Sequence, residues 1–141
     1  MAVTASQLKN QRYQPKREEI IVFKNPNFDS VLGRDEYVVK RVIAFEGERV
    51  TVKDGEVTVY NAAYPAGFNP DANIQNHGDP NLPTDGDVDV VVPDDHLFVM
   101  GDNRVGDYSC DSRDCMGPIP LYNVVGPVAL RIFPFTQITT F

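Results

Sequence analysis

The sequence lacks both the long apolar run of a membrane span and the basic excess of a nucleic-acid-binding protein. Its 141 residues include 13 Lys and Arg against 20 Asp and Glu, a formal net charge of −7. No basic face is therefore available, and we expect no nucleic-acid partner. No apolar run approaches the roughly 20 residues of a membrane-spanning helix, and the polar N-terminus is no signal peptide. We expect the chain as given to be soluble.

Histidine and cysteine are scarce, with two of each in the chain. His77 and His96 lie in unrelated segments and lack the spacing of metal ligands. Cys110 and Cys115 alone would leave a structural zinc site two ligands short. We therefore expect no metal site.

Helix signals are weak, because eleven Pro and ten Gly are scattered through the chain. Strand signals are strong: short runs rich in β-branched and aromatic residues are separated by turn residues. The expected strands are 18–24, 36–45, 48–53, 56–60, 87–92, 96–100 and 123–133. Asp54-Gly55 is typical of a tight hairpin turn. The pattern predicts an all-β fold of antiparallel sheets or a partly open barrel.

A change in composition divides the chain. Residues 61–85 are rich in Pro, Gly, Asn and Asp and have no sustained periodicity, which is typical of an irregular insertion. We expect a β core domain formed by 13–60 and 86–141 and interrupted by this insertion. Residues 1–12 would be a disordered or vector-derived N-terminus.

Lys40 stands out among the lysines because of its position in "EYVVKRVIAF". Strand alternation places Val38, Lys40, Val42 and Ala44 on one face, so the lysine has apolar neighbours on both sides. Burial would lower the pKa of its amine toward neutrality, and a neutral amine can act as a general base. The strand pattern alone favours the other possibility, that Lys40 reaches past the valines to water or pairs with an acid, because buried charged residues are rare.

Three segments, in this order, resemble conserved boxes of the bacterial type I signal peptidases. "QPKREEIIVFKNP" (14–26) is similar to the strand segment Pro-Lys-Arg-Gly-Asp that precedes the catalytic lysine in that family. "KRVIAFEGERV" (40–50) resembles the lysine box itself. "HLFVMGDNRVGDYSCDSRDCMGPIP" (96–120) resembles the last box, Gly-Asp-Asn-Arg followed by Ser-x-Asp-Ser-Arg. The resemblance covers most of the chain, and three ordered boxes make it specific.

The resemblance implies the fold of a signal peptidase and a membrane-bound serine endopeptidase with a serine–lysine dyad. Such enzymes remove signal peptides from exported preproteins on the outer face of the bacterial cytoplasmic membrane, and they need no cofactor. Lys40 matches the general base and Ser109 the serine that orients it. The supporting residues implied are Asp111, Arg113, Gly101, Asp102, Asn103 and Arg104. The strand of Val38 and Val39 would line the pockets for small substrate side chains before the cleavage point, although a plain core position is an equal alternative for each valine.

The nucleophile box, Ser-Met-x-Pro-Thr, has no match in this sequence. The serines Ser6, Ser30 and Ser112 all lack its context, so we expect the nucleophile and the membrane anchor to be missing and the chain alone to be inactive. A degenerate, non-catalytic module that binds extended peptides is the alternative. A self-cleaving repressor or pilus-type peptidase is disfavoured, because those proteins lack the last box.

The two cysteines bracket the matched acid and base of the last box. An extracytoplasmic location, as the resemblance implies, would allow Cys110 and Cys115 to form a disulfide, although two free thiols are an equal alternative. The closed loop would be short, so the disulfide would stabilise the folded protein only modestly. Its expected use is to hold Asp111 and Arg113 in place.

Overall fold

The computed structural model describes residues 13–26, 37–72, 80, 82–105 and 110–128. Its strands are β1 (Ile20–Lys24), β2 (Tyr37–Phe45), β3 (Arg49–Lys53), β4 (Glu56–Tyr60), β5 (Val88–Val91), β6 (His96–Met100), β7 (Ile119–Pro120) and β8 (Val124–Pro127). A single 3-10 turn, η2 (Leu121–Asn123), is the one helical element of these segments. No helix within the described residues is long and apolar enough to cross a bilayer.

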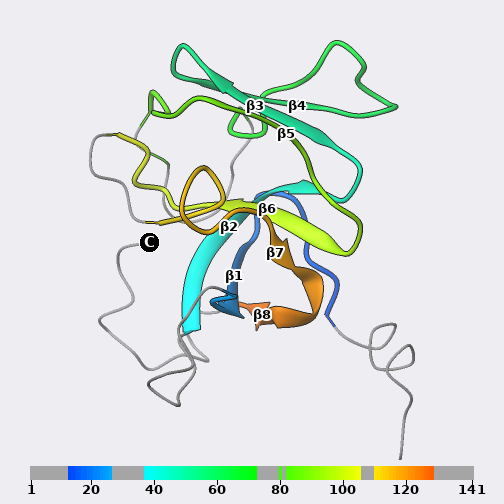
Figure 1. Cartoon of the computed structure of the whole chain (residues 1–141), viewed down its shortest axis with the longest axis vertical. Coiled ribbons are helices and arrows are strands. Elements are labelled where there is room, and N and C mark those ends of the chain that lie inside the picture. The colour runs from blue at the N-terminus through cyan, green and yellow to red at the C-terminus, as the bar shows by residue number, and fades with distance from the viewer. Residues whose placement is uncertain (1–12, 27–36, 73–79, 81, 106–109, 129–141) are drawn as a thin grey trace, which may run out of the picture.

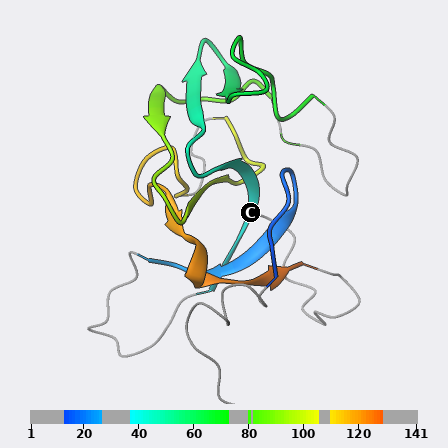
Figure 2. The same ribbon diagram turned by 90° about the vertical axis from the view of Figure 1, so that its right-hand side faces the viewer.

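The strands form two antiparallel sheets (Figure 1). The larger sheet has the strand order β7-β6-β2-β1-β8, and the smaller sheet has the order β4-β3-β5. Figure 2, a view at right angles, shows the smaller sheet at one end of the described part of the molecule and β1 and β8 at the other. Neither sheet closes on itself, so the expected all-β fold of antiparallel sheets is confirmed.

Two strands, β2 and β6, contribute to both hydrophobic cores of the molecule. On β6, Phe98 and Met100 belong to the core that includes β3 and β4. The alternate residues Leu97 and Val99 belong to the core that includes β1, β7 and β8. Because successive side chains of a strand point to opposite faces, β6 is buried on both sides. The segment that follows β6 therefore begins from a strand that is buried on both faces.

The hairpin of β3 and β4 confirms the turn predicted at Asp54-Gly55. Lys53 pairs with Glu56, and the two residues between them have φ of +52° and +83°. Positive φ at both central residues is the geometry of the type I′ turn that suits a twisted hairpin.

Strand boundaries were predicted to within two residues for the first six strands. β7 and η2 were missed, because a two-residue strand that ends in Pro120 has no periodicity to read. Of the last predicted strand, 123–133, the structure has β8, and residues 129–133 lie outside the described part.

The predicted faces of β2 are correct only for its first part. Val38 and Val42 pack in the same core, as alternation predicts. Ala44 instead joins Ile43 in the other core, so its predicted place beside Val42 was wrong. The ladder between β2 and β6 shifts register between Val42 and Ala44, and such a bulge reverses the side-chain alternation beyond it.

Candidate functional site

Lys40 lies in the middle of β2, opposite Ile21 of β1, and only 3% of its surface is exposed. Burial lowers the pKa of its amine below the ordinary value of 10.5. Among the nearby charges, Asp111 and Asp114 oppose this decrease, whereas Arg113 adds to it. Of the two positions that the sequence allowed for Lys40, buried or reaching to water, the structure has the buried one. Burial disfavours the charged ammonium form.

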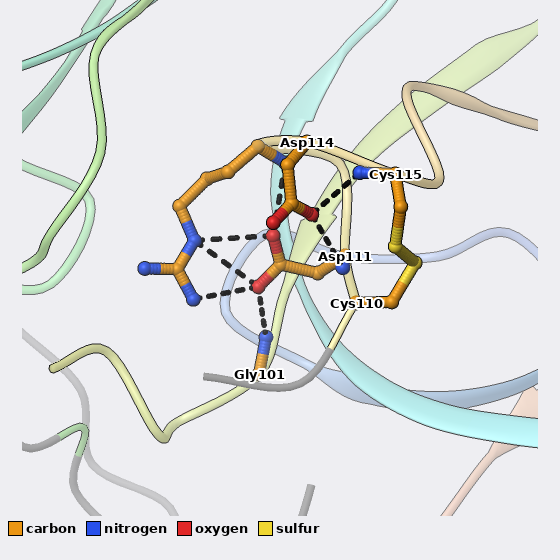
Figure 3. The surroundings of a disulfide bond; sticks show 6 residues. Gly101, Cys110, Asp111, Asp114 and Cys115 are labelled. Atoms are coloured by element: carbon orange, nitrogen blue, oxygen red, sulfur yellow. Dashed lines mark hydrogen bonds and ion pairs between the residues drawn. A yellow bond between two sulfur atoms is a disulfide. The ribbon is translucent and has the colours of Figure 1, made fainter. Parts of the chain in front are cut away.

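The acid and base of the last box form a fully buried ion pair. Arg113 Nη2 donates to Asp111 Oδ2 at 2.7 Å and Nε donates to Oδ1 at 3.1 Å, with neither side chain exposed. The backbone amides of Arg113 and Gly101 donate to the same carboxylate, at 2.9 and 3.1 Å (Figure 3). Both side-chain oxygens of Asp111 therefore accept hydrogen bonds, so the side chain is held in one position.

Ser112 fastens this segment to β6. Its backbone amide donates to the Val99 carbonyl at 3.0 Å, and its Oγ accepts from the Val99 amide at 2.9 Å. Val99 pairs in turn with Val42 of β2, two residues after Lys40. Ser112 therefore completes the backbone bonding of a buried strand. It is the only serine in the part of the chain that the structure describes.

Disulfide-bonded Cys110 and Cys115 close the short segment that carries Asp111 and Arg113, with their Cα atoms 5.5 Å apart. Asp114 Oδ1 accepts from the Cys115 amide at 2.6 Å, and Figure 3 shows this carboxylate beside that of Asp111. The two sulfur atoms and the Asp114 carboxylate lie within 4.8 Å of one another. Because the sulfurs are bonded to each other, they offer no thiolate to a metal ion in this state.

A second buried ion pair lies next to Lys40 along β2. Arg41 is fully buried. Its Nε donates to Asp102 Oδ1 at 2.8 Å and its Nη2 donates to Asp102 Oδ2. Its Nη1 donates to the carbonyl of Glu18, at 2.9 Å. The fork thus joins β2 to the segment after β6 and to the turn before β1.

Arg104 makes the third buried ion pair, and its partner is Asp71. Nη1 and Nη2 of Arg104 donate to the two Asp71 oxygens at 2.8 and 3.1 Å, and 2% or less of either side chain is exposed. Nη1 also donates to Thr84 Oγ1 at 3.1 Å, and Nε donates to the Gly101 carbonyl. The carbonyl of Asn103 accepts from Arg113 Nη2 at 3.2 Å.

The strand that the resemblance assigns to substrate binding is β2, and its residues Val38 and Val39 are both half-buried. Tyr37–Val39 pair with β1 on one side of β2. On the other side, the ladder with β6 begins only at Arg41, opposite Met100. No strand within the described residues covers that edge of Tyr37–Val39.

The structure therefore brings together most of the residues matched to the last box and the lysine box. Ser109, matched to the orienting serine, lies outside the described residues, as do Ser6 and Ser30. Residue-based reasoning missed four partners in the buried network: Arg41, Asp71, Thr84 and Ser112. Arg41 and Ser112 belong to the matched boxes and could have been found there, but nothing local marks Asp71 or Thr84.

Comparison with known proteins identifies the family of the chain. The family model described as signal peptidase, peptidase S26, matches residues 2–133. The chain is 37% identical over 127 residues to probable signal peptidase I-1 of Synechocystis, a match that covers 89% of this chain and 58% of that protein. It is 31% identical over 123 residues to signal peptidase I of Bacillus amyloliquefaciens, covering 87% of this chain and 61% of that protein.

A solved structure shows the same likeness. The crystal structure of a signal peptidase I from Enterococcus faecalis superposes with a TM-score of 0.58 at 26% identity, covering 82% of this chain and 97% of that one. The chain spans about three fifths of the length of the two bacterial relatives above. Because the family model matches nearly all of it, the chain belongs to the signal peptidase family, peptidase S26.

Proposed function

We propose that this chain carries the general base and the supporting charges of a signal peptidase that uses a serine–lysine dyad. Lys40 is the base, and the observation that carries the proposal is its burial beside the Asp111–Arg113 pair. Its pKa is lowered mainly by loss of solvation. A buried lysine with a lowered pKa is a functional candidate on physical grounds, because an amine must be neutral to accept a proton.

The reaction follows from a neutral amine next to a serine hydroxyl. Lys40 Nζ takes the hydroxyl proton while the serine oxygen attacks the scissile carbonyl carbon. The tetrahedral intermediate collapses, the peptide C–N bond breaks, and the leaving amine takes the proton from Nζ. Water, activated by the same amine, then hydrolyses the acyl-enzyme. In this proposal Ser109 orients Nζ, and the nucleophile comes from a box that this sequence does not contain.

The substrate would be the signal peptide of an exported preprotein, bound as an extended strand. The edge of Tyr37–Val39 supports this choice, because no strand of the described residues covers it and a peptide can add to a sheet edge through backbone hydrogen bonds. Val38 and Val39 would face the residues that precede the cleavage point. The parent protein would sit in the bacterial cytoplasmic membrane with this domain on the outer face. The 141 residues by themselves would be inactive.

The natural gene product tests the proposal by cleavage of a preprotein in detergent. Lys40→Met should abolish cleavage, whereas Lys53→Met, which removes an exposed lysine beside the hairpin turn, should not change it. Wild-type cleavage by the Lys40→Met protein would refute the assignment of the base. Cleavage by the purified 141-residue chain, lost on Lys40→Ala, would show that the nucleophile lies within it. Binding of an extended peptide by a gene product that cleaves nothing would favour the degenerate module.

A further inference from the structure

Arg104 connects the insertion to the segment that surrounds Lys40. Its guanidinium contacts Asp71 and Thr84, which both lie in the insertion. Its carbonyl accepts from the Asp85 amide at 2.7 Å and from Arg113 Nη1 at 3.2 Å. Arg113 Nη1 also donates to the Asp85 carbonyl, at 2.9 Å. Asp71 is 33 residues from Arg104 along the chain, so this contact is entirely tertiary.

Two routes of contact lead from Asp71 to the lysine. The first passes through Arg104 to Arg113, which is bonded to Asp111, and both members of that pair act on the pKa of Lys40. The second passes through the weaker Arg104–Asp102 ion pair, at 4.0 Å, to Asp102 and the Arg41 fork. Arg41 is the neighbour of Lys40 on β2, so both routes end at the proposed base.

We infer that Asp71 and Thr84 are positioning residues for the peptidase reaction, acting through Arg104 on the segment that holds the Asp111–Arg113 pair. This inference rests on the proposed function. A guanidinium has five donors in a rigid fork, so its acceptors determine its position closely. The Asp71 carboxylate engages both terminal nitrogens, Thr84 Oγ engages Nη1, and the Gly101 carbonyl engages Nε. Two of these three acceptors come from the insertion.

The contacts of Arg104 indicate that the insertion positions Arg113 and does not merely pack against the sheet. The carbonyl of Arg104 accepts a hydrogen bond from the Arg113 side chain, which forms the ion pair with Asp111. A displacement of Arg104 would therefore move an acceptor of Arg113. Thr84 is fully buried, and its amide donates to the Gly55 carbonyl at 2.9 Å, which ties the Arg104 site to the β3–β4 hairpin. The insertion thus fixes the distance between that hairpin and the segment after β6.

The test uses the natural gene product and the variant Asp71→Asn, which turns one acceptor oxygen into a donor facing the guanidinium. We expect kcat to fall by about 10- to 100-fold, the range that a displacement of roughly 1 Å can produce, with KM little changed. The acidic limb of the kcat/KM profile should also shift, because it reports the pKa of the free enzyme's base. Asp71→Glu should restore part of kcat, and Thr84→Val should lower it by less than Asp71→Asn.

Asp89→Asn is the matched control. Asp89 also binds an arginine through both oxygens, but the pair with Arg49 is exposed on β3 and β5. This control should leave kcat, KM and the pH profile unchanged. A pH-independent loss of activity that follows the fraction of folded protein would overturn the inference in favour of a structural role.

The double variant Asp71→Leu/Arg104→Met guards against a trivial loss of folding. Apolar replacement of a buried ion pair often preserves stability, yet we expect kcat to remain low because the fork is gone. Recovery of wild-type kcat with recovered folding would overturn the inference, as would unfolding of all three Asp71 variants. Lys40→Met separates the two proposals. If it is inactive while Asp71→Asn keeps wild-type kcat, only the positioning role fails, whereas activity of Lys40→Met refutes the base itself.

Discussion

Replacing Glu18 by glycine should make this protein more stable. Glu18 has a φ of +73°, in the left-handed region that costs residues with a Cβ atom free energy. Its amide donates to the Val42 carbonyl at 2.8 Å, and the Val42 amide donates to the Glu19 carbonyl at the same distance. Two residues thus oppose one, as in a β-bulge whose first residue is left-handed. The family segment that 14–26 resembles has glycine at this position.

The magnitude follows from two opposing effects. Relief of the left-handed conformation contributes about 1–2 kcal/mol, and the greater freedom of glycine in the unfolded chain offsets about 0.5–1 kcal/mol of it. The expected net gain is about 1 kcal/mol, or about 3 °C in Tm for a domain of this size. The carbonyl of Glu18 would continue to accept from Arg41, because glycine keeps the backbone conformation.

The gain should also depend on pH. Burial raises the pKa of the Glu18 carboxyl, and Asp71 raises it further, against the opposing effects of Arg41 and Arg17. A carboxyl with a raised pKa binds its proton more tightly in the folded state, so ionised Glu18 costs stability at pH 7 and the cost disappears as pH falls below the unfolded value. The advantage of Glu18→Gly should therefore be larger at pH 7 than at pH 4.

Urea unfolding at the two pH values, followed by circular dichroism, measures both effects. Glu18→Gln keeps the left-handed residue and removes the charge, so it should recover only the pH-dependent part. Glu46→Gly makes the same exchange where φ is not positive and should lose stability. If Glu18→Gly is no more stable than the wild type at pH 7, or if Glu46→Gly gains as much, backbone strain at Glu18 is not the cause.

Three further outcomes can be measured on the chain. Lys40→Met should raise the urea midpoint at pH 7, and the gap should close as pH rises toward 10.5, because a folded pKa below the unfolded one costs stability as long as the unfolded chain still binds the proton on Lys40. Asp111→Ala should cost about 3–5 kcal/mol by leaving buried Arg113 unpaired, and should lower the pKa of Lys40 further in an NMR titration of its Cε resonance. The double variant Cys110→Ser/Cys115→Ser should lose about 2 kcal/mol, the chain-entropy value for so short a loop, and equal stability of this variant would mean that the disulfide adds nothing.

Local patterns predicted the parts of this fold that local physics determines. The runs of β-branched residues form strands where expected, and Asp54-Gly55 forms the hairpin turn because both residues tolerate positive φ. The β2–β6 bulge could not be predicted in this way, because register depends on the partner strand and not on the sequence of β2 alone. Beyond the bulge, Ala44 therefore packs on the unexpected side.

The candidate site shows the same division. Strand alternation places Lys40 on an apolar face, where its side chain can be buried or can reach past its neighbours to water. Only the tertiary packing around Lys40 decides between the two, and it buries the side chain. The Asp71–Arg104 contact joins residues 33 positions apart and has no local signature. Composition marked the insertion as irregular, and irregular segments do not reveal which of their many polar side chains will be buried.

Paired charges explain how the pKa of Lys40 can be lowered in so highly charged a region. Three buried arginines lie in the segments around Lys40, and each faces an aspartate: Arg41 with Asp102, Arg104 with Asp71, and Arg113 with Asp111. An unpaired buried carboxylate would stabilise the ammonium form and raise the pKa of the lysine. Pairing makes each arginine and its aspartate nearly neutral as a unit, and the opposite effects of Asp111 and Arg113 on Lys40 show this cancellation. Desolvation then dominates, so removing a carboxylate should alter the amine more than its distance alone suggests.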